Sequence, residues 1–142
     1  MANPLPDQWT EKDVEEAIAR DVPDELLYVP ISVSMYPPDC AWAQEICIRL
    51  SAHSHFNVRG NAILGFGHLA RTCRELDLPR VQPIVEAGLA DPHEFVRGQA
   101  ESAAMDIHIY LGVAVAGYDT EHTERRNQAI DELLAKHGRS KA

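Results

Sequence analysis

The chain has 142 residues, enough for one domain with a single modest core, and 45% of them are apolar. It carries 22 acidic and 13 basic residues, and the resulting formal charge of −9 disfavours binding to nucleic acids and favours a basic protein partner. No apolar run approaches the roughly 20 residues of a membrane span, so we expect no membrane insertion. The same negative charge would also serve solubility alone, and composition does not separate these two roles.

Two further features of composition predict a cytoplasmic protein. Residues 1–7 (MANPLPD) lack the basic and apolar regions of a secretory signal peptide. The three cysteines, Cys40, Cys47 and Cys73, form an odd set without a C-x-x-C pair, which predicts reduced thiols rather than a disulfide scaffold. Cys47 lies in an apolar helical stretch and is predicted to be a small core residue.

The N-terminal quarter of the chain predicts little regular structure beyond one helix. Thr10 precedes an acidic, periodic stretch, which predicts a capped helix ending near Arg20. Residues 23–27 predict one additional turn. Residues 29–38 contain three prolines and several β-branched residues, so we expect an extended linker there.

The rest of the chain predicts five helices. Asp39 is expected to cap a helix to about residue 51, with Trp42, Ile46 and Leu50 on one face. Further helices are predicted over residues 57–75, 81–89, 94–111 and 120–137, with a loop at 76–80, a glycine-bracketed turn at 112–117 and a polar tail at 138–142. Gly138 is expected to end the last helix. Its apolar stripe, Ile130, Leu133 and Leu134, is expected to cover one end of the preceding helices.

Two segments of the sequence align at a fixed offset of 38 residues. They are residues 53–62 (HSHFNVRGNA) and 91–100 (DPHEFVRGQA). A repeat of this length is typical of stacked helix pairs. Val58 and Val96 are predicted to begin the buried stripe of each second helix, with alanine four residues later for close approach. Asp91 and Pro92 predict a turn in which Asp91 caps the following helix.

This pattern resembles the HEAT repeat of the short bacterial kind, in which a turn aspartate and an arginine tie successive repeats together. The resemblance covers about residues 39–111 and gives these roles to Asp91, Arg59 and Arg97; His53 departs from it, standing where aspartate is usual. It implies an all-α fold, a single-domain HEAT-like α-solenoid. The expected repeats are about 39–76 and 77–112, with an N-terminal cap and linker over 1–38 and a capping helix over 120–137.

The sequence offers no convincing catalytic or metal-binding constellation. His53 and His55 lie on a predicted turn, whereas His68 lies two to three helical turns away, so these histidines and Cys73 are poorly spaced for zinc. No serine lies in a G-x-S-x-G context, and residues 65–67 (GFG) lack the Lys-Ser/Thr of a phosphate-binding loop. Cys73 lies beside Arg71 and Arg74 but is more simply an ordinary helix residue. We therefore expect no metal, no cofactor and no catalytic residue.

With catalytic and metal sites set aside, the remaining candidate is a binding surface on the predicted helices. In stacked helix pairs the second helices line the inner face, and the positions left after removing the packed ones form one row. Its members are Asn61, Leu64 and His68 on one helix and their equivalents Gln99, Ser102 and Asp106 on the other. We predict that this row contacts a partner; a solvated face without a partner is the alternative.

A second resemblance suggests the class of protein to which that partner belongs. Residues 41–45 (AWAQE), residues 65–71 (GFGHLAR) and the two Val-Arg-Gly triplets resemble HEAT-type immunity proteins of toxin–immunity loci, including contact-dependent growth inhibition systems. The resemblance implies a non-catalytic cytoplasmic protein that binds and masks a toxin domain, commonly a basic nuclease. Two alternatives remain: an accessory factor or enzyme subunit resembling HEAT-like bilin lyases, which expects a reactive cysteine or a ligand pocket, and a structural component of a homo-oligomer.

Overall fold

The computed structural model describes residues 9–136, except for the side chains of residues 122–124, 126 and 127, and over this part of the chain it contains helices and no strand. The all-α prediction is therefore confirmed. The helices are α1 (Glu11–Arg20), α2 (Pro23–Leu26), α3 (Tyr28–Met35), α4 (Cys40–Leu50), α5 (Phe56–Thr72), α6 (Leu78–Leu89), α7 (Glu94–Leu111) and α8 (Thr120–Lys136).

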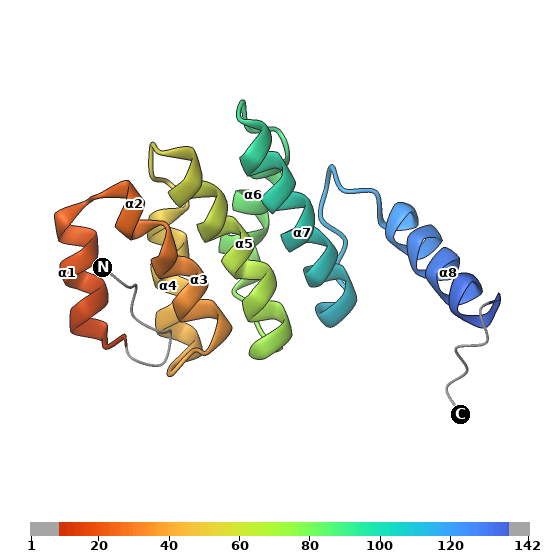
Figure 1. The fold of residues 1–142 in the computed structure, drawn as a ribbon, viewed down its shortest axis with the longest axis horizontal. Helices are drawn as coiled ribbons and strands as arrows, with labels where there is room; N and C mark the ends of the chain where they lie inside the picture. The colour runs from red at the N-terminus through yellow and green to blue at the C-terminus, as the bar shows by residue number, and fades with distance from the viewer. Residues whose placement is uncertain (1–8, 137–142) are drawn as a thin grey trace.

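The central helices form two layers (Figure 1). Helices α3, α5 and α7 lie side by side in one layer, and the closest packing in the protein is between α5 and α7. Helix α4 packs against α3 and α5, and α6 packs against α7, so both lie behind that layer. Val58 and Val96 are fully buried, which confirms the predicted register of α5 and α7.

Helix α3 corrects the prediction of an extended linker over residues 29–38. Val29 and Val33 are buried, so burial against α5 outweighs the unfavourable local sequence. Pro30 is the third residue of α3, where its missing N–H removes no hydrogen bond of the helix. The other two prolines follow the end of α3, where they break no helix.

The helix caps agree with the sequence at the first and fourth helices. Thr10 and Asp13 form a reciprocal capping box at α1, and Asp39 Oδ1 accepts a 2.9 Å hydrogen bond from the Trp42 N–H at α4. The predicted ends of α5 and α6 were less accurate. Helix α5 ends at Thr72 rather than residue 75, and α6 begins at Leu78 rather than residue 81, so the loop between them keeps its expected length but lies three residues earlier in the chain.

The helices that follow the two repeated turns, α5 and α7, are capped by histidine. This corrects the prediction that Asp91 caps α7. His93 Nδ1 accepts a 3.0 Å hydrogen bond from the Phe95 N–H at the start of α7, and His55 Nδ1 accepts one of 3.2 Å from the Asn57 N–H at α5. Asp91 instead accepts a hydrogen bond from the His93 N–H at 2.9 Å and pairs with Arg59. Asp91 therefore orders the turn and joins it to the preceding repeat.

The repeated arginines hold their own turns in the same way. Arg59 Nη1 donates to the carbonyls of His53 and Ser54, at 3.2 and 2.9 Å. Arg97 Nη1 donates to the two equivalent carbonyls, those of Asp91 and Pro92, at 2.8 and 3.1 Å.

Only one of the two arginines reaches a carboxylate of a neighbouring turn. Arg59 makes two hydrogen bonds to Asp91, at 2.8 and 3.0 Å, which confirms the predicted link. Arg97 has no carboxylate partner among the described residues, so the link expected for it is not seen. His53, which stands where aspartate was expected, has Nε2 at 2.6 Å from Asp21 Oδ1 and thus joins its turn to the one after α1.

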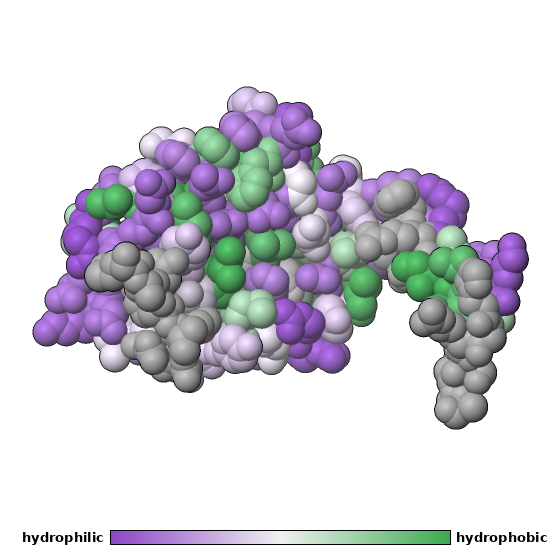
Figure 2. Space-filling model, viewed as in Figure 1, coloured by the Kyte–Doolittle hydropathy of each residue, from purple (hydrophilic) through white to green (hydrophobic). Residues whose placement is uncertain are grey.

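Helix α8 has the predicted extent but does not cover the end of the helical layers. Ile130, Leu133 and Leu134 are 45%, 54% and 40% exposed, and α8 makes little contact with α7 (Figure 1). Hydrophobic surface is accordingly visible on α8, at the right of Figure 2. The physical reason is that the segment before α8 takes that place: Val115 is 1% exposed, and Val113 and Tyr118 pack on the core. Gly138, predicted to end the helix, lies outside the described residues.

The cysteines differ from the prediction of three reduced thiols. Cys40 and Cys73 form a disulfide, because the antiparallel packing of α4 and α5 brings the start of one helix to the end of the other, with a Cα–Cα distance of 6.2 Å. Cys47 is free and buried, which confirms its predicted place in the core. Burial raises the pKa of its thiol to about 12.

The Arg59–Asp91 pair should contribute more to stability than a surface pair. We expect Asp91→Asn to lower the free energy of unfolding by about 1–3 kcal/mol, because the pair is largely shielded and charge-assisted. The matched control is Glu45→Gln in the exposed Glu45–Arg80 pair, with an expected cost below about 1 kcal/mol. Urea denaturation at neutral pH measures both, and equal costs would contradict the structural role of Asp91.

The contribution of the Arg59–Asp91 pair to stability should depend on pH in one direction only. The hydrogen bonds from Arg59 hold the pKa of Asp91 below its ordinary value of 3.8. The stabilisation is therefore fully present above the ordinary value and is lost as the pH falls through the lower folded-state pKa. The stability difference between the wild type and Asp91→Asn should shrink only in that acidic range.

Close approach of α4 and α5 at Gly65 gives a second stability prediction. A Cβ at this position would lie 2.6 Å from the buried Cys47 Sγ, so Gly65→Ala should cost about 1–3 kcal/mol. Gly98→Ala, on the open side of α7, meets no atom within 4 Å and should instead stabilise by up to about 1 kcal/mol through helix propensity. Thermal melts of the two variants should move in opposite directions; a Gly65→Ala melt like that of the wild type would refute the close approach.

Candidate protein-binding surface

The predicted row of six residues lies on the two adjacent helices α5 and α7. Leu64 and His68 on α5 and Gln99, Ser102 and Asp106 on α7 are half-buried, whereas Asn61 is only 5% exposed. The row therefore divides into a buried end at Asn61 and Gln99 and a more open end at His68 and Asp106.

At the buried end the polar side chains join helices to one another. Asn61 Nδ2 donates to the Leu27 carbonyl just before α3, at 3.0 Å, and Asn61 Oδ1 accepts from Gln99 Nε2 at 2.9 Å. An asparagine that is buried and paired on both sides offers no group to a partner, so its role here is to hold three helices together. We accordingly exclude Asn61 from the candidate surface and retain Gln99 at its margin.

At the open end a cluster of charged and polar side chains sits where α3, α5 and α7 meet. Arg71 Nη2 lies 3.2 Å from His68 Nδ1 and 3.6 Å from Met35 Sδ. Gly67 lets α7 approach, because a Cβ there would lie 3.0 Å from Ala103 Cα and 3.1 Å from Asp106 Oδ2. Asp106 is thus brought beside α5, within the electrostatic reach of Arg71.

The environment of this cluster favours the neutral forms of its titratable groups. Burial lowers the pKa of His68, and the charge of Arg71 lowers it further. Burial raises the pKa of Asp106, and Arg71 opposes that shift. Arg71 was not predicted as part of the surface, although its place three residues after His68 on the same helix was a usable signal.

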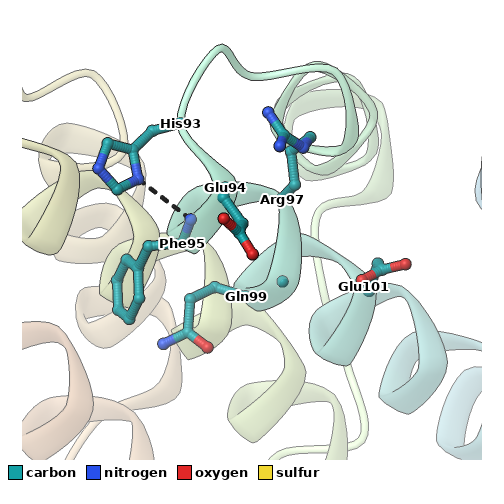
Figure 3. A pocket seen from close by; sticks show the side chains of 7 residues that line it. His93, Glu94, Phe95, Arg97, Gln99 and Glu101 are labelled. Atoms are coloured by element: carbon teal, nitrogen blue, oxygen red, sulfur yellow. Dashed lines mark hydrogen bonds between the residues drawn. The ribbon is translucent and has the colours of Figure 1, made fainter.

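A second feature, an open hollow of about 640 Å³, lies beside the N-terminal half of α7 (Figure 3). Its lining residues are His93, Glu94, Phe95, Arg97, Gly98, Gln99 and Glu101. Gln99 also belongs to the predicted row, so the hollow and the row are neighbouring parts of one surface. In the sticks of Figure 3, Glu94, Arg97 and Glu101 extend away from the helix axis, and all three residues are exposed.

The hollow occupies the place that a further helix would fill in the repeat pattern. A Cβ on Gly60 would meet the Phe95 ring at 2.8 Å and Gln99 Cγ at 3.3 Å, whereas one on the equivalent Gly98 meets nothing within 4 Å. Phe56 and Ile63 of α5 correspond to Glu94 and Glu101 on α7, so charged residues replace apolar ones where α7 faces solvent. The hollow was not predicted, although the second Val-Arg-Gly triplet supplies two of its lining residues, Arg97 and Gly98.

Other site chemistries find little support among residues 9–136. No group of three or more His, Cys, Asp or Glu side chains in this part of the chain could hold a metal ion. Cys40 and Cys73 are bonded to each other and Cys47 is buried, so the described structure presents no accessible free thiol. None of the described helices is both long and apolar enough to cross a membrane.

The half-buried Asp106 gives a testable electrostatic prediction. Because burial raises its folded-state pKa, its ionised form should oppose folding, and stability should rise as the pH falls through that pKa. We expect Asp106→Asn to raise the free energy of unfolding slightly at pH 7, by less than about 1 kcal/mol, since the group is partly solvated. The melting temperature should rise accordingly. The exposed Glu101→Gln is the control on the same helix, and a lower melting temperature for Asp106→Asn would show that the Arg71 contact outweighs burial.

The relation of this chain to known proteins was tested by three comparisons. No protein-family model, no curated protein and no solved structure matched it. The functional assignment therefore depends on the residues and geometry described above, namely the repeated turns, the polar cluster at Arg71 and the open hollow at Gly98.

Proposed function

We propose that this chain is a short HEAT-like solenoid that works by binding another protein, with the α7 hollow and the adjoining row as its contact surface. The observation that carries this proposal is the contrast between Gly60 and Gly98. The same motif is covered by the next helix in one copy and left open in the other. An open surface with the shape of an internal packing surface is suited to a protein partner.

The spacing of the helices supports the solenoid. Helices α4 and α6 begin at Cys40 and Leu78, and α5 and α7 begin at Phe56 and Glu94, so each pair of starts is 38 residues apart. Helices α1 and α3 would form a shortened first pair, because Glu15 of α1 binds Arg49 of α4 much as Glu45 of α4 binds Arg80 of α6. Each pair would stack on the next, as in repeat proteins generally.

The charge of the surface favours a basic partner. The hollow is lined by two carboxylates, Glu94 and Glu101, against one guanidinium, Arg97, in a chain of formal charge −9. A field of one sign speeds association with a partner of the opposite sign and selects against partners of like charge. This fits the resemblance to immunity proteins, so we propose a non-catalytic protein that binds a basic toxin domain and masks its active site.

A stable complex needs an interface larger than the hollow alone. A stable interface buries roughly 800 Å² on each partner and involves some 20–30 residues a side. The seven residues of the hollow are too few for that. The partner must therefore also cover the face of α5 and α7 that carries His68, Arg71 and Asp106.

One alternative keeps some support. The exposed stripe of α8, Ile130, Leu133 and Leu134, is an apolar surface of the kind that helices bury against one another, which favours self-association. Light scattering after size-exclusion chromatography tests self-association, because a monomer at micromolar concentration would exclude the homo-oligomer alternative. The bilin-lyase alternative gains nothing from the structure, since Cys73 is in a disulfide.

Charge reversal at the hollow tests the proposed function. We expect Glu94→Lys combined with Glu101→Lys to weaken binding of a basic toxin domain, sought among the products of adjacent genes, by more than about 10-fold, a change of about 1.4 kcal/mol or more. Calorimetric titration at two salt concentrations measures this, and the wild-type affinity should fall as salt rises because the attraction is screened.

The matched control changes the net charge equally at a distant place. Glu16→Lys on α1 combined with Asp24→Lys on α2 reverses two exposed carboxylates outside the hollow. These two changes should alter the association rate moderately and leave the dissociation rate unchanged. An equal loss of affinity in both double variants would mean that only net charge matters and would refute the hollow as a binding site. No binding by the wild type would refute the immunity role itself.

A further inference from the structure

The disulfide between Cys40 and Cys73 lies at the surface rather than in the core. Cys40 is the first residue of α4 and is exposed, and Cys73 follows the last residue of α5 and is half-buried. An open hollow of about 220 Å³ adjoins Cys40. Its other lining residues are Ala41, Gln44, Glu75, Leu76 and Asp77. An attacking group therefore has room to reach the Sγ of Cys40.

We propose that this disulfide is a thiol–disulfide exchange site whose co-reactant is a dithiol, either a small molecule or a protein with a paired-cysteine site. This inference goes beyond the proposed binding function and does not depend on the identity of a protein partner. Buried structural disulfides resist exchange because no thiolate reaches them, whereas accessible ones are the exchangeable class.

The exchange balances in two steps. A thiolate of the dithiol attacks Cys40 Sγ, a mixed disulfide forms, and Cys73 leaves as a thiolate that takes up a proton. Thr72 Oγ1 lies 3.8 Å from Cys73 Sγ and can donate a hydrogen bond to the leaving sulfur. The second thiol of the reductant then displaces Cys40, so the chain gains two electrons and two protons and the reductant becomes a disulfide.

Cys40 is also the residue that should attack when an oxidised dithiol re-forms the disulfide. Cys40 is the first residue of an 11-residue helix whose N-terminal N–H groups favour a nearby negative charge. After reduction, Cys40 is therefore the better nucleophile of the two cysteines for attack on an oxidised dithiol. Cys73 lies at a helix C-terminus, where the dipole disfavours a thiolate. In the reduction step the exposure of Cys40 therefore decides which sulfur is attacked, and Cys73 leaves with the help of protonation and of the Thr72 hydroxyl.

The disulfide restrains a segment that touches the candidate surface. It links residues 33 positions apart and holds the loop after α5 against the start of α4, where the Asp77 N–H also donates to Gln44 Oε1 at 2.7 Å. Arg74 in this loop lies over the Tyr110 ring of α7 at 4.9 Å and donates to the Arg71 carbonyl at 3.1 Å. Opening the disulfide should therefore loosen the loop that directly follows Arg71 and contacts its carbonyl.

A backbone feature adds to this effect. Arg74 has φ of 57°, a left-handed conformation that a non-glycine residue adopts only when its surroundings hold it. Cys73 is the residue directly before it. Loss of the covalent restraint at Cys73 should let Arg74 relax to an ordinary conformation and leave the Tyr110 ring.

Thiol labelling of the full chain tests the proposal. Protein purified without reductant is treated with iodoacetamide under native conditions, before and after incubation with dithiothreitol, and the labelled peptides are identified by mass spectrometry. We expect no label on Cys40 or Cys73 before reduction and label on both afterwards. Cys47 is the internal control: it is buried and free, and should be labelled only in denaturant.

Two outcomes of the labelling would overturn the proposal. Label on Cys40 and Cys73 in the untreated protein would mean that the bond does not form in solution. Resistance of both residues to dithiothreitol, with labelling only after denaturation, would mean that the bond is purely structural and closed to exchange.

Measurements of thermal stability and of hydrogen exchange test the structural consequence of reducing the disulfide. We expect dithiothreitol to lower the melting temperature by about 10 °C, as loss of a restraint on a loop of this length implies. Hydrogen exchange should speed up over residues 68–77 and remain unchanged in α1. The double variant Cys40→Ser/Cys73→Ser should match the reduced wild type and no longer respond to dithiothreitol. An oxidised and a reduced protein with equal melting and exchange would refute the restraint.

Discussion

The guanidinium of Arg59 is the contact on which the arrangement of the central helices depends. It holds two carbonyls of the turn before α5 and at the same time binds both carboxylate oxygens of Asp91 in the turn before α7. One planar group with several donors thereby sets the spacing of two consecutive turns. With the turns set, α5 and α7 lie side by side, and small residues such as Gly60 and Gly67 allow their close approach.

The candidate surface is a consequence of where this pattern stops. Arg97 and Gly98 repeat the sequence of Arg59 and Gly60, but among the described residues no carboxylate pairs with the arginine and no atom covers the glycine. The replacement of Phe56 by Glu94 at the equivalent position keeps the uncovered side of α7 in water. The result is an acidic surface shaped like a packing surface, which supports the proposal of a basic protein partner.

Local signals were enough for the regular parts of the fold. The bounds of α7 and the caps at Thr10 and Asp39 followed from periodicity and capping chemistry. Helix α3 could not be predicted in this way, because its prolines and β-branched residues disfavour a helix locally and only burial against α5 stabilises it. Among the predicted surface residues, spacing placed His68 and Asp106 on adjacent helices, as the structure has them. The burial of Asn61 was not predictable from spacing, because it comes from three converging helices.

By itself, the sequence determined an all-helical chain with a 38-residue repeat, the buried register of Val58 and Val96, and the pairing of an arginine with a turn aspartate. The first two follow from residues close together in the chain or at a fixed period, and the third from the resemblance of that period to HEAT repeats. Only the tertiary structure decided that Cys40 bonds to Cys73, that α8 leaves its apolar stripe exposed, and that Gly98 faces an open hollow. Those features depend on which helices pack against one another and which end without a neighbour, and no local pattern specifies either.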